Sequence, residues 1–145
     1  MDSCAKRSAA LSRGLARHVD LSVSFLKGTG TLAPAFRREG IPVYSLGIER
    51  PRDVAGALRL FDLVFSGRFD LVHTHLLHAG VLGRAAAFLA RVPAIVHTQH
   101  NTLYWETDSA VLAGANRATL RFADRIIAVG DTVAEMVARH GGVPP

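Results

Sequence analysis

Five of the seven histidines fall in two short stretches of the chain, His73 to His78 and His97 to His100. Each stretch begins within the last residues of an apolar run that predicts a strand. In an open sheet of parallel strands, ligands bind beyond the carboxyl ends of the strands. We therefore expect His75, His78 and His100, which follow the predicted strand residues, to contact a ligand. His73 and His97 fall on the predicted strands themselves, where a hydrogen-bonded structural histidine is the commoner case.

A neutral imidazole offers one N–H donor and one acceptor nitrogen, and histidine is also the commonest metal ligand in proteins. His73-Thr74-His75 has the His-x-His form that amidohydrolase-type enzymes use to hold zinc. Those enzymes need a barrel of about 250 residues and further carboxylate or lysine ligands, and neither is present in these 145 residues. We therefore expect no metal and no cofactor, and a zinc-dependent hydrolase is the least favoured alternative. No Gly-x-Gly-x-x-Gly follows a predicted strand, and the Gly-x-Ser-x-Gly elbow of serine hydrolases is absent.

The histidines are embedded in an alternation of extended and helical patterns. The predicted strands cover residues 20–26, 41–46, 69–73, 94–98 and 124–129. The predicted helices cover residues 3–17, 32–38, 51–65, 79–91 and 109–122, and a last helix is capped by Asp131. Later strands that are almost continuously apolar, separated by helices, predict an α/β fold in which a parallel sheet is covered on both faces. Residues 141–145 are typical of the start of an interdomain linker.

Composition narrows the class of protein. Hydrophobic residues make up 49% and charged residues 20% of the chain, which is typical of globular proteins. There is no apolar run of about 18 residues, as a membrane span requires, and no signal-peptide pattern, so we expect a cytoplasmic protein. The net charge is +5, but the arginines, Arg84 among them, are scattered and predicted to lie on solvated helix faces. Weak contact with an anionic membrane surface is the next interpretation, and nucleic-acid binding is not expected without a basic stripe.

Four segments resemble the N-terminal domain of family four glycosyltransferases of the GT-B fold. The first is residues 69–80 (Phe-Asp-Leu-Val-His-Thr-His-Leu-Leu-His-Ala-Gly), and the second is residues 92–101 (Val-Pro-Ala-Ile-Val-His-Thr-Gln-His-Asn). The third is residues 123–130 (Ala-Asp-Arg-Ile-Ile-Ala-Val-Gly), where the family usually has Ser in place of Gly130. Gly-Ile-Pro-Val at residues 40–43 fits as well. The segments occur in the family's order, and the resemblance covers essentially the whole chain.

The resemblance implies a Rossmann-like, doubly wound parallel sheet of about five strands, formed by residues 1–140. It also implies a retaining glycosyltransferase that needs no bound metal. Its N-terminal half binds a glycan, lipid-linked or small-molecule acceptor, and a C-terminal domain absent from this chain binds the nucleotide-sugar donor. A histidine at the position of His100 contacts the donor sugar, so His100 is the implied catalytic residue. The implied substrate-binding residues are His75, His78, Asn101, Thr102, Tyr104 and Gly130.

Two departures from the family pattern bear on activity. The family begins with a central strand and a glycine-rich loop, and this chain begins at the helix that follows them. The paired-glutamate motif of the donor domain is also absent. We therefore expect the full-length form to be an enzyme and the isolated chain to be inactive. Any contact with a membrane is expected at its inner face. The alternative is a non-catalytic module that binds a glycan or lipid acceptor.

Overall fold

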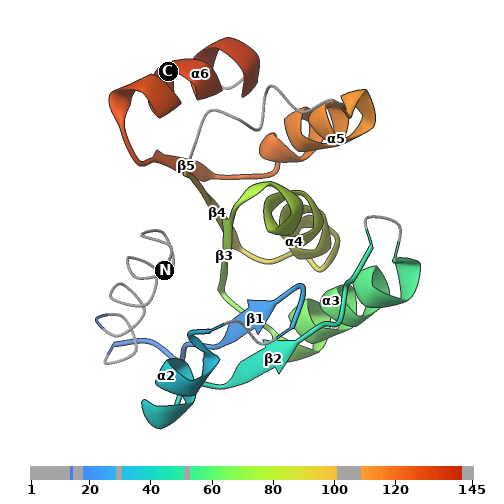
Figure 1. The fold of residues 1–145 in the computed structure, drawn as a ribbon, viewed down its shortest axis with the longest axis vertical. Helices are drawn as coiled ribbons and strands as arrows, with labels where there is room; N and C mark the ends of the chain where they lie inside the picture. The colour runs from blue at the N-terminus through green and yellow to red at the C-terminus, as the bar shows by residue number, and fades with distance from the viewer. Residues whose placement is uncertain (1–13, 15–17, 29–30, 51–52, 101–108, 142–145) are drawn as a thin grey trace. The chain divides into compact units, whose positions relative to one another are not determined.

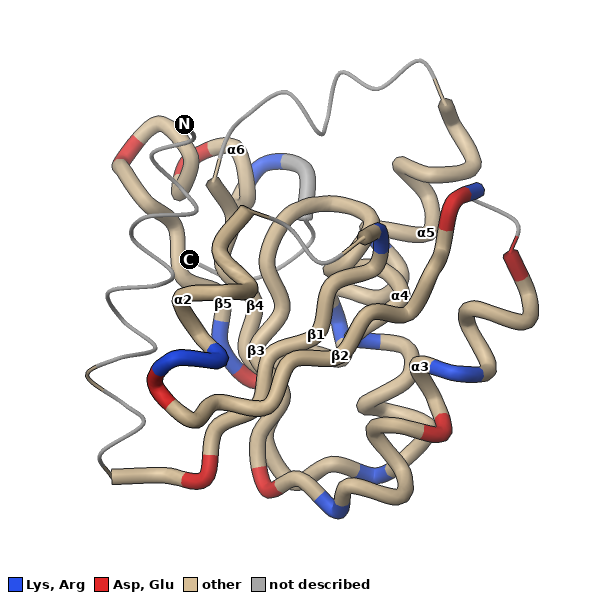
Figure 2. The backbone as a smooth tube through the Cα atoms, turned by 60° about the horizontal axis from the view of Figure 1, so that its bottom comes forward, with Lys and Arg blue, Asp and Glu red and all other residues tan. Residues whose placement is uncertain are grey.

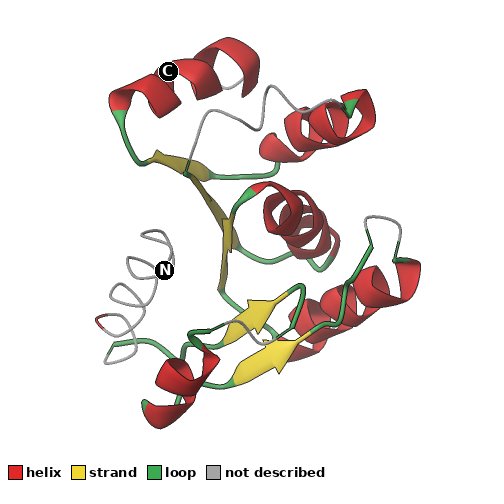
Figure 3. Cartoon of the chain, in the orientation of Figure 1, coloured by secondary structure: helices red, strands yellow, loops and turns green. Residues whose placement is uncertain are grey.

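The computed structural model describes residues 14, 18–28, 31–50, 53–100 and 109–141, in which strands and helices alternate (Figures 1 and 3). The chain divides into two compact units, residues 1–56 and residues 57–145. All strand pairs among the described residues are parallel, and they form one sheet of two strands and one of three. The predicted α/β, Rossmann-like class is therefore confirmed, with its five strands distributed over two sheets.

The first unit is built on β1 (Val23–Phe25) and β2 (Val43–Ser45), joined by α2 (Ala33–Arg38). Its core is Phe36 and Ile41, against which Phe25 packs with its ring centroid 6.5 Å from that of Phe36. Gly40, at φ +75°, ends the helix in the left-handed conformation that glycine tolerates best, and the chain turns into β2. The helix α3 (Val54–Gly67) begins in this unit and continues into the second.

The second unit carries β3 (Leu71–His75), β4 (Ala94–Gln99) and β5 (Arg125–Ala128), which are adjacent in that order. His75, the last residue of β3, pairs with Thr98, and Gln99, the last residue of β4, pairs with Ala128. The carboxyl ends of all three strands therefore lie along one edge of the sheet. This is the edge at which α/β proteins place their ligands.

Three helices accompany this sheet: α4 (Leu77–Leu89), α5 (Ala110–Leu120) and α6 (Asp131–Gly141). The helix α4 packs on β3 and β4 and lies beside α5, whereas α6 packs on β5 (Figure 1). Ser109 caps α5, because its hydroxyl accepts a hydrogen bond from Leu112 N at 3.2 Å. None of the described helices is both long and apolar enough to span a bilayer. Along the described backbone, basic and acidic residues are both spread over several helices and loops (Figure 2).

The structure corrects three details of the sequence interpretation. Strand β3 continues to His75, two residues beyond the predicted end, because the polar residues 73–75 stay paired with residues 96–98 of β4. The helix α4 starts at Leu77, so that His78 lies in its first turn. Asp131 is the first residue of α6 and not its cap. Of the predicted helix over residues 3–17, only Gly14, which is helical, belongs to the described residues.

Candidate functional site

The carboxyl edge of the three-stranded sheet brings two of the predicted site residues into contact. His75 Nδ1 lies 3.0 Å from His100 Nε2, and the two ring centroids are 5.3 Å apart. The contact follows from the parallel register, since His75 pairs with Thr98 and His100 comes two residues later. Both side chains are partly buried. These two histidines, which follow consecutive strands, therefore lie together at one edge of the sheet, and their role in binding remains a prediction.

A third histidine supports this pair from within β3. The ring of His73 lies 4.3 Å from that of His75, centroid to centroid, and His73 Nε2 is 2.7 Å from the hydroxyl oxygen of Thr98. His73 and His75 are two residues apart on one strand, so both side chains project from the same face of the sheet. Three imidazole rings thus lie in succession on that face, ending at His100.

The residues that alternate with them form a second, buried network on the opposite face. His97, with no exposed surface, lies between the hydroxyl of Thr74 (Oγ1 to Nδ1, 2.9 Å) and the amide of Gln99 (Nε2 to Oε1, 3.1 Å). Gln99 Oε1 can only accept, so His97 Nε2 donates to it, and Nδ1 accepts from the Thr74 hydroxyl. His97 is thus the hydrogen-bonded structural histidine that its place on a strand predicts.

Burial lowers the pKa of three histidines in and beneath the site. Burial, followed by the proximity of His73, His100 and His97, lowers the pKa of His75 to about 3. Burial, and next the positive charge of Arg84, lowers the pKa of His97 to about 4. The pKa of His73 is lowered by burial and by His100. Near neutral pH these rings therefore act as neutral hydrogen-bonding groups, which suits uncharged partners such as hydroxyl groups.

Arg84 corrects the prediction that the scattered arginines lie on solvated helix faces, because its side chain is completely buried. Arg84 Nη2 donates to Asn116 Oδ1 at 2.7 Å and to Thr119 Oγ1 at 2.9 Å. Arg84 Nε and Nη1 and Asn116 Nδ2, all donors, have no hydrogen-bond partner among the described residues. Burial lowers the pKa of Arg84 to about 10, so it stays charged at neutral pH. The sequence signal was an arginine within the otherwise apolar segment 81–90.

Two glycines let α4 approach the sheet closely enough to bury that arginine. A Cβ atom on Gly80 would lie 2.6 Å from Arg84 Nη1 and 2.8 Å from His97 Cε1. A Cβ atom on Gly83 would lie 2.7 Å from Cγ2 of Thr74. All three distances are too short for a real Cβ atom, so the close packing of α4 on the sheet requires glycine at these positions.

The turn between β3 and α4 holds a strained residue directly after His75. Leu76 has φ 65° and ψ 167°, a region that is essentially restricted to glycine. No side chain caps the N-terminus of α4. The strain, of about 1–3 kcal/mol, persists because the β3–β4 pairing holds the strand up to His75 while the packing of α4 holds the helix from Leu77 onward.

Two of the remaining predicted site residues belong to the described part of the chain. His78 is exposed on the first turn of α4, and Gly130 is exposed between β5 and α6 with no atom within 4 Å of a Cβ atom placed on it. Asn101, Thr102 and Tyr104 lie outside the described residues. No group of three His, Cys, Asp or Glu side chains within the described ranges is placed to hold a metal ion.

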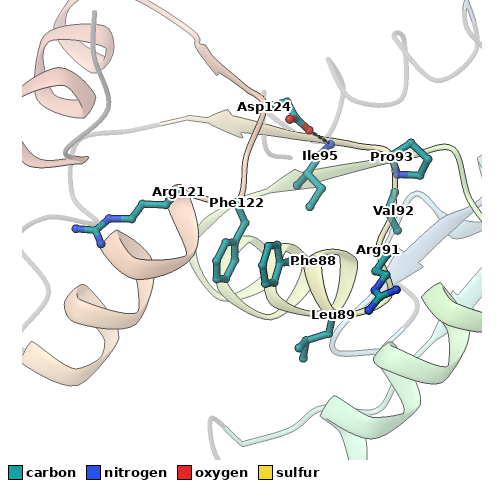
Figure 4. Close-up of a pocket in the computed structure, with 9 residues that line it drawn as sticks. All are labelled: Phe88, Leu89, Arg91, Val92, Pro93, Ile95, Arg121, Phe122 and Asp124. Atoms are coloured by element: carbon teal, nitrogen blue, oxygen red, sulfur yellow. Dashed lines mark hydrogen bonds between the residues drawn. The ribbon is translucent and has the colours of Figure 1, made fainter.

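A hollow lies at the amino ends of β4 and β5. The rings of Phe88 and Phe122 stack there at 4.0 Å, with Arg91 and Arg121 among the residues that line it (Figure 4). Asp124, also in its lining, accepts a hydrogen bond from Ile95 N at 2.7 Å and so joins the entry of β4 to that of β5. These contacts stabilise the loops at that end of the sheet, and none of the predicted site residues is present there.

The chain is similar to a known protein family and to a known protein. The model of the family described as Glycosyltransferase Family 4 matches residues 5–145, which is nearly the whole chain. A UDP-Gal:alpha-D-GlcNAc-diphosphoundecaprenol alpha-1,3-galactosyltransferase of Escherichia coli is 35% identical over 79 residues. That match covers 54% of this chain and 20% of the length of the relative.

Proposed function

The chain belongs to glycosyltransferase family 4, and from that premise we propose that it is the acceptor-binding part of a retaining glycosyltransferase. The reaction moves a sugar from a nucleotide-sugar donor, bound by a further domain, to a lipid-linked sugar acceptor. The name of the Escherichia coli relative supports both substrate classes, since that protein transfers galactose from UDP-galactose to a diphosphoundecaprenol-linked sugar.

The observation that carries the proposal is the contact between His75 and His100 at the carboxyl edge of β3 and β4. A ring held there offers hydrogen bonds to sugar hydroxyl groups. In our proposal His100 contacts the donor sugar, orients it and stabilises the charge that develops as the bond to the nucleotide breaks. The proposal places no metal or cofactor in this step. Asn101, Thr102 and Tyr104, which follow His100 in the sequence, would shape the acceptor side, with His78 and Gly130 as further contacts.

The net positive charge of the chain supports a further part of the proposal. With 17 basic and 12 acidic residues, weak attraction to the anionic inner face of a membrane would bring the protein to a lipid-linked acceptor. In this proposal the protein acts from the cytoplasmic side as a peripheral partner of the membrane.

The test is a transfer assay with a protein that joins this chain to its donor-binding domain, with nucleotide sugars and a lipid-linked acceptor. Replacing His100 by Ala should lower kcat by about 100-fold or more, with a much smaller effect on acceptor affinity. His18→Ala is the matched control, because His18 is an exposed histidine at neither strand end. Unchanged turnover in His100→Ala would remove His100 from the catalytic role.

A second measurement separates the enzyme from the alternative binding module. The 145-residue chain alone should not transfer sugar, since a transferase must bring both substrates into contact geometry. Transfer by the chain alone from any nucleotide sugar would contradict this expectation. Acceptor binding by the joined protein without transfer from any donor would favour the non-catalytic module.

A further inference from the structure

The first turn of α4, residues 77–80, follows the carboxyl end of β3 after the single residue Leu76. The first N–H groups of an α-helix have no acceptor inside the helix, and they form the positive end of the helix dipole. Proteins commonly place a capping side chain or an acidic residue there. In α4 no side chain caps the N-terminus, and residues 77–80 include no Asp or Glu. The first turn therefore keeps its positive charge.

A buried cation lies beneath the same turn. Arg84 follows Gly80 by one helical turn, and helical side chains point back toward the N-terminus of their helix. A Cβ atom on Gly80 would lie 2.6 Å from Arg84 Nη1, so the guanidinium group lies against the first turn. The Arg84 side chain has no exposed surface, and its Nε and Nη1 have no hydrogen-bond partner among the described residues. The helix dipole and the guanidinium group thus add their positive charge at one place.

The charge of Arg84 acts on its surroundings, and the turn above it is open to solvent. Burial, and next the positive charge of Arg84, lowers the pKa of His97 to about 4. On the outside of the turn, Leu76 and His78 are exposed and Ala79 is partly exposed. An anion can therefore reach the first N–H groups of α4 from solvent, while Arg84 attracts it from the protein side.

We propose that the first turn of α4 is an anion site, which binds a phosphate group of a substrate through the N–H groups of residues 77–79 and the side chain of His78, with the charge of Arg84 behind them. A phosphate group suits this place because it accepts several backbone N–H bonds at a helix N-terminus and carries the negative charge that the turn lacks. In this inference the ligand of His78 is a phosphate group and not a sugar hydroxyl group.

This inference deepens the proposed function and rests on it for the source of the phosphate group. The nucleotide-sugar donor carries a diphosphate, and a lipid-linked acceptor whose sugar is attached through a diphosphate carries one as well. The two sources share one chemistry, and the experiments below distinguish them. The site lies at the carboxyl edge of β3, beside the histidine pair, where both substrates of a transfer reaction must meet.

The first test is a titration of the 145-residue chain with inorganic pyrophosphate, followed through the backbone amide signals in NMR spectra. The signals of residues 77–79 should shift and reach saturation. The N-termini of α5 and α6 are internal controls, because Ser109 caps α5 and Asp131 lies in the first turn of α6. Their amide signals should stay in place. Shifts of equal size at all three helices, or none at residues 77–79 in millimolar pyrophosphate, would overturn the proposal.

Two variants test the contribution of Arg84. Arg84→Met removes the charge and should weaken pyrophosphate binding by about tenfold or more. If this variant does not fold, Asn116→Asp decides, because it leaves the first turn unchanged and places a carboxylate beside Arg84 Nη2, which lies 2.7 Å from Asn116 Oδ1. It should also weaken the binding. Arg91→Met is the matched control, since it removes an exposed arginine beyond the other end of α4 and should leave the binding unchanged. Unchanged affinity in a folded Arg84 or Asn116 variant, or an equal loss in Arg91→Met, would refute the role of Arg84.

His78→Asp tests the first turn itself, because it places a carboxylate where the phosphate group is expected. An acidic residue at a helix N-terminus is favourable, so the variant should keep or raise the Tm while pyrophosphate binding is lost. His18→Asp, at an exposed histidine of the first unit, is the matched control and should bind pyrophosphate as the unmodified chain does. Pyrophosphate binding by His78→Asp with unchanged affinity would contradict the proposal.

The same variant identifies the source of the phosphate group in the protein that joins this chain to its donor-binding domain. A rise in the KM of the lipid-diphosphate acceptor assigns the site to the acceptor, and a rise in the KM of the nucleotide sugar assigns it to the donor. Unchanged values of both would show that the site binds no substrate phosphate, against the proposal. If pyrophosphate binds at residues 77–79 as expected while the joined protein transfers no sugar, the anion site stands and the proposed function fails.

Discussion

Asn116→Asp should stabilise the protein, because it places a negative charge beside a buried cation that has no carboxylate partner among the described residues. Arg84 Nη2 lies 2.7 Å from Asn116 Oδ1, and desolvation by burial lowers the Arg84 pKa to about 10. At about 1.4 kcal/mol for each pKa unit, burying this charge costs about 3 kcal/mol. This cost is absent from the unfolded chain, where Arg84 is solvated. A negatively charged partner for Arg84 in the folded protein can therefore offset part of it.

The expected gain combines three effects. Opposite charges about 4 Å apart attract by about 4 kcal/mol at an effective dielectric constant near 20. Removing the unpartnered Nδ2 of Asn116 relieves about 1–3 kcal/mol. Desolvation of the new carboxylate offsets several kcal/mol of this sum. We expect a net increase of about 1–2 kcal/mol in the free energy of unfolding at pH 7, or about 2–6 °C in Tm.

The assay is thermal and urea unfolding of the chain and of two variants at the same pH. Asn116→Leu, of similar size, removes the acceptor Oδ1 from a buried charge and should destabilise by about 2–4 kcal/mol. The carboxyl group in Asn116→Asp will have a pKa lowered by Arg84. Its contribution is therefore fully present above about pH 4 and is lost as the pH falls through its folded-state pKa. If Asn116→Asp destabilises by more than about 1 kcal/mol at pH 7, Arg84 is already compensated and this reasoning is wrong.

Three further predictions concern the same unit. Lowering the pH from 7.5 to 5 should decrease the free energy of unfolding by about 2 kcal/mol through His97 alone. The reason is that His97 is protonated below about pH 6.5 in the unfolded chain but only below about pH 4 in the folded protein. Urea unfolding at the two pH values measures the decrease, and it should be smaller in a His97→Gln variant. Leu76→Gly should raise the free energy of unfolding by up to about 1 kcal/mol, because it removes the backbone strain at φ 65°. Leu76→Ala keeps a Cβ atom and should not stabilise the protein. Equal Tm values for the two variants would contradict the strain. Gly80→Ala should destabilise the protein by about 1–3 kcal/mol, because the added methyl group overpacks against Arg84 and His97. Gly114→Ala is the control: it lies in a helix with no atom within 4 Å of the added Cβ, and it should stabilise the protein by up to about 1 kcal/mol. Equal effects of the two substitutions would refute the close approach of α4.

The order of the elements and the edge that carries the site follow from the sequence by itself. Apolar runs such as residues 94–98 and 124–129, separated by helical patterns, are sufficient to predict parallel strands, because only a sheet covered on both faces buries them. The histidines at the ends of two consecutive strands then had to meet at one edge. Element ends were less accurate: β3 runs two residues further than predicted, because pairing with β4 outweighs the polar character of His73, Thr74 and His75.

Only the tertiary structure decided what each histidine contacts. His73 and His75 lie beside His100 on one face of the sheet, whereas His97 is buried on the other face. The sequence does not distinguish these positions, because the pairing register of the strands decides which face each side chain projects from. Arg84 shows the same limit more sharply. By residue type it belonged with the solvated arginines, and its burial depends on glycines 80 and 83, whose missing side chains let α4 approach the sheet. The close approach of α4 to the sheet is decided by packing, and the residue type of Arg84 does not encode it.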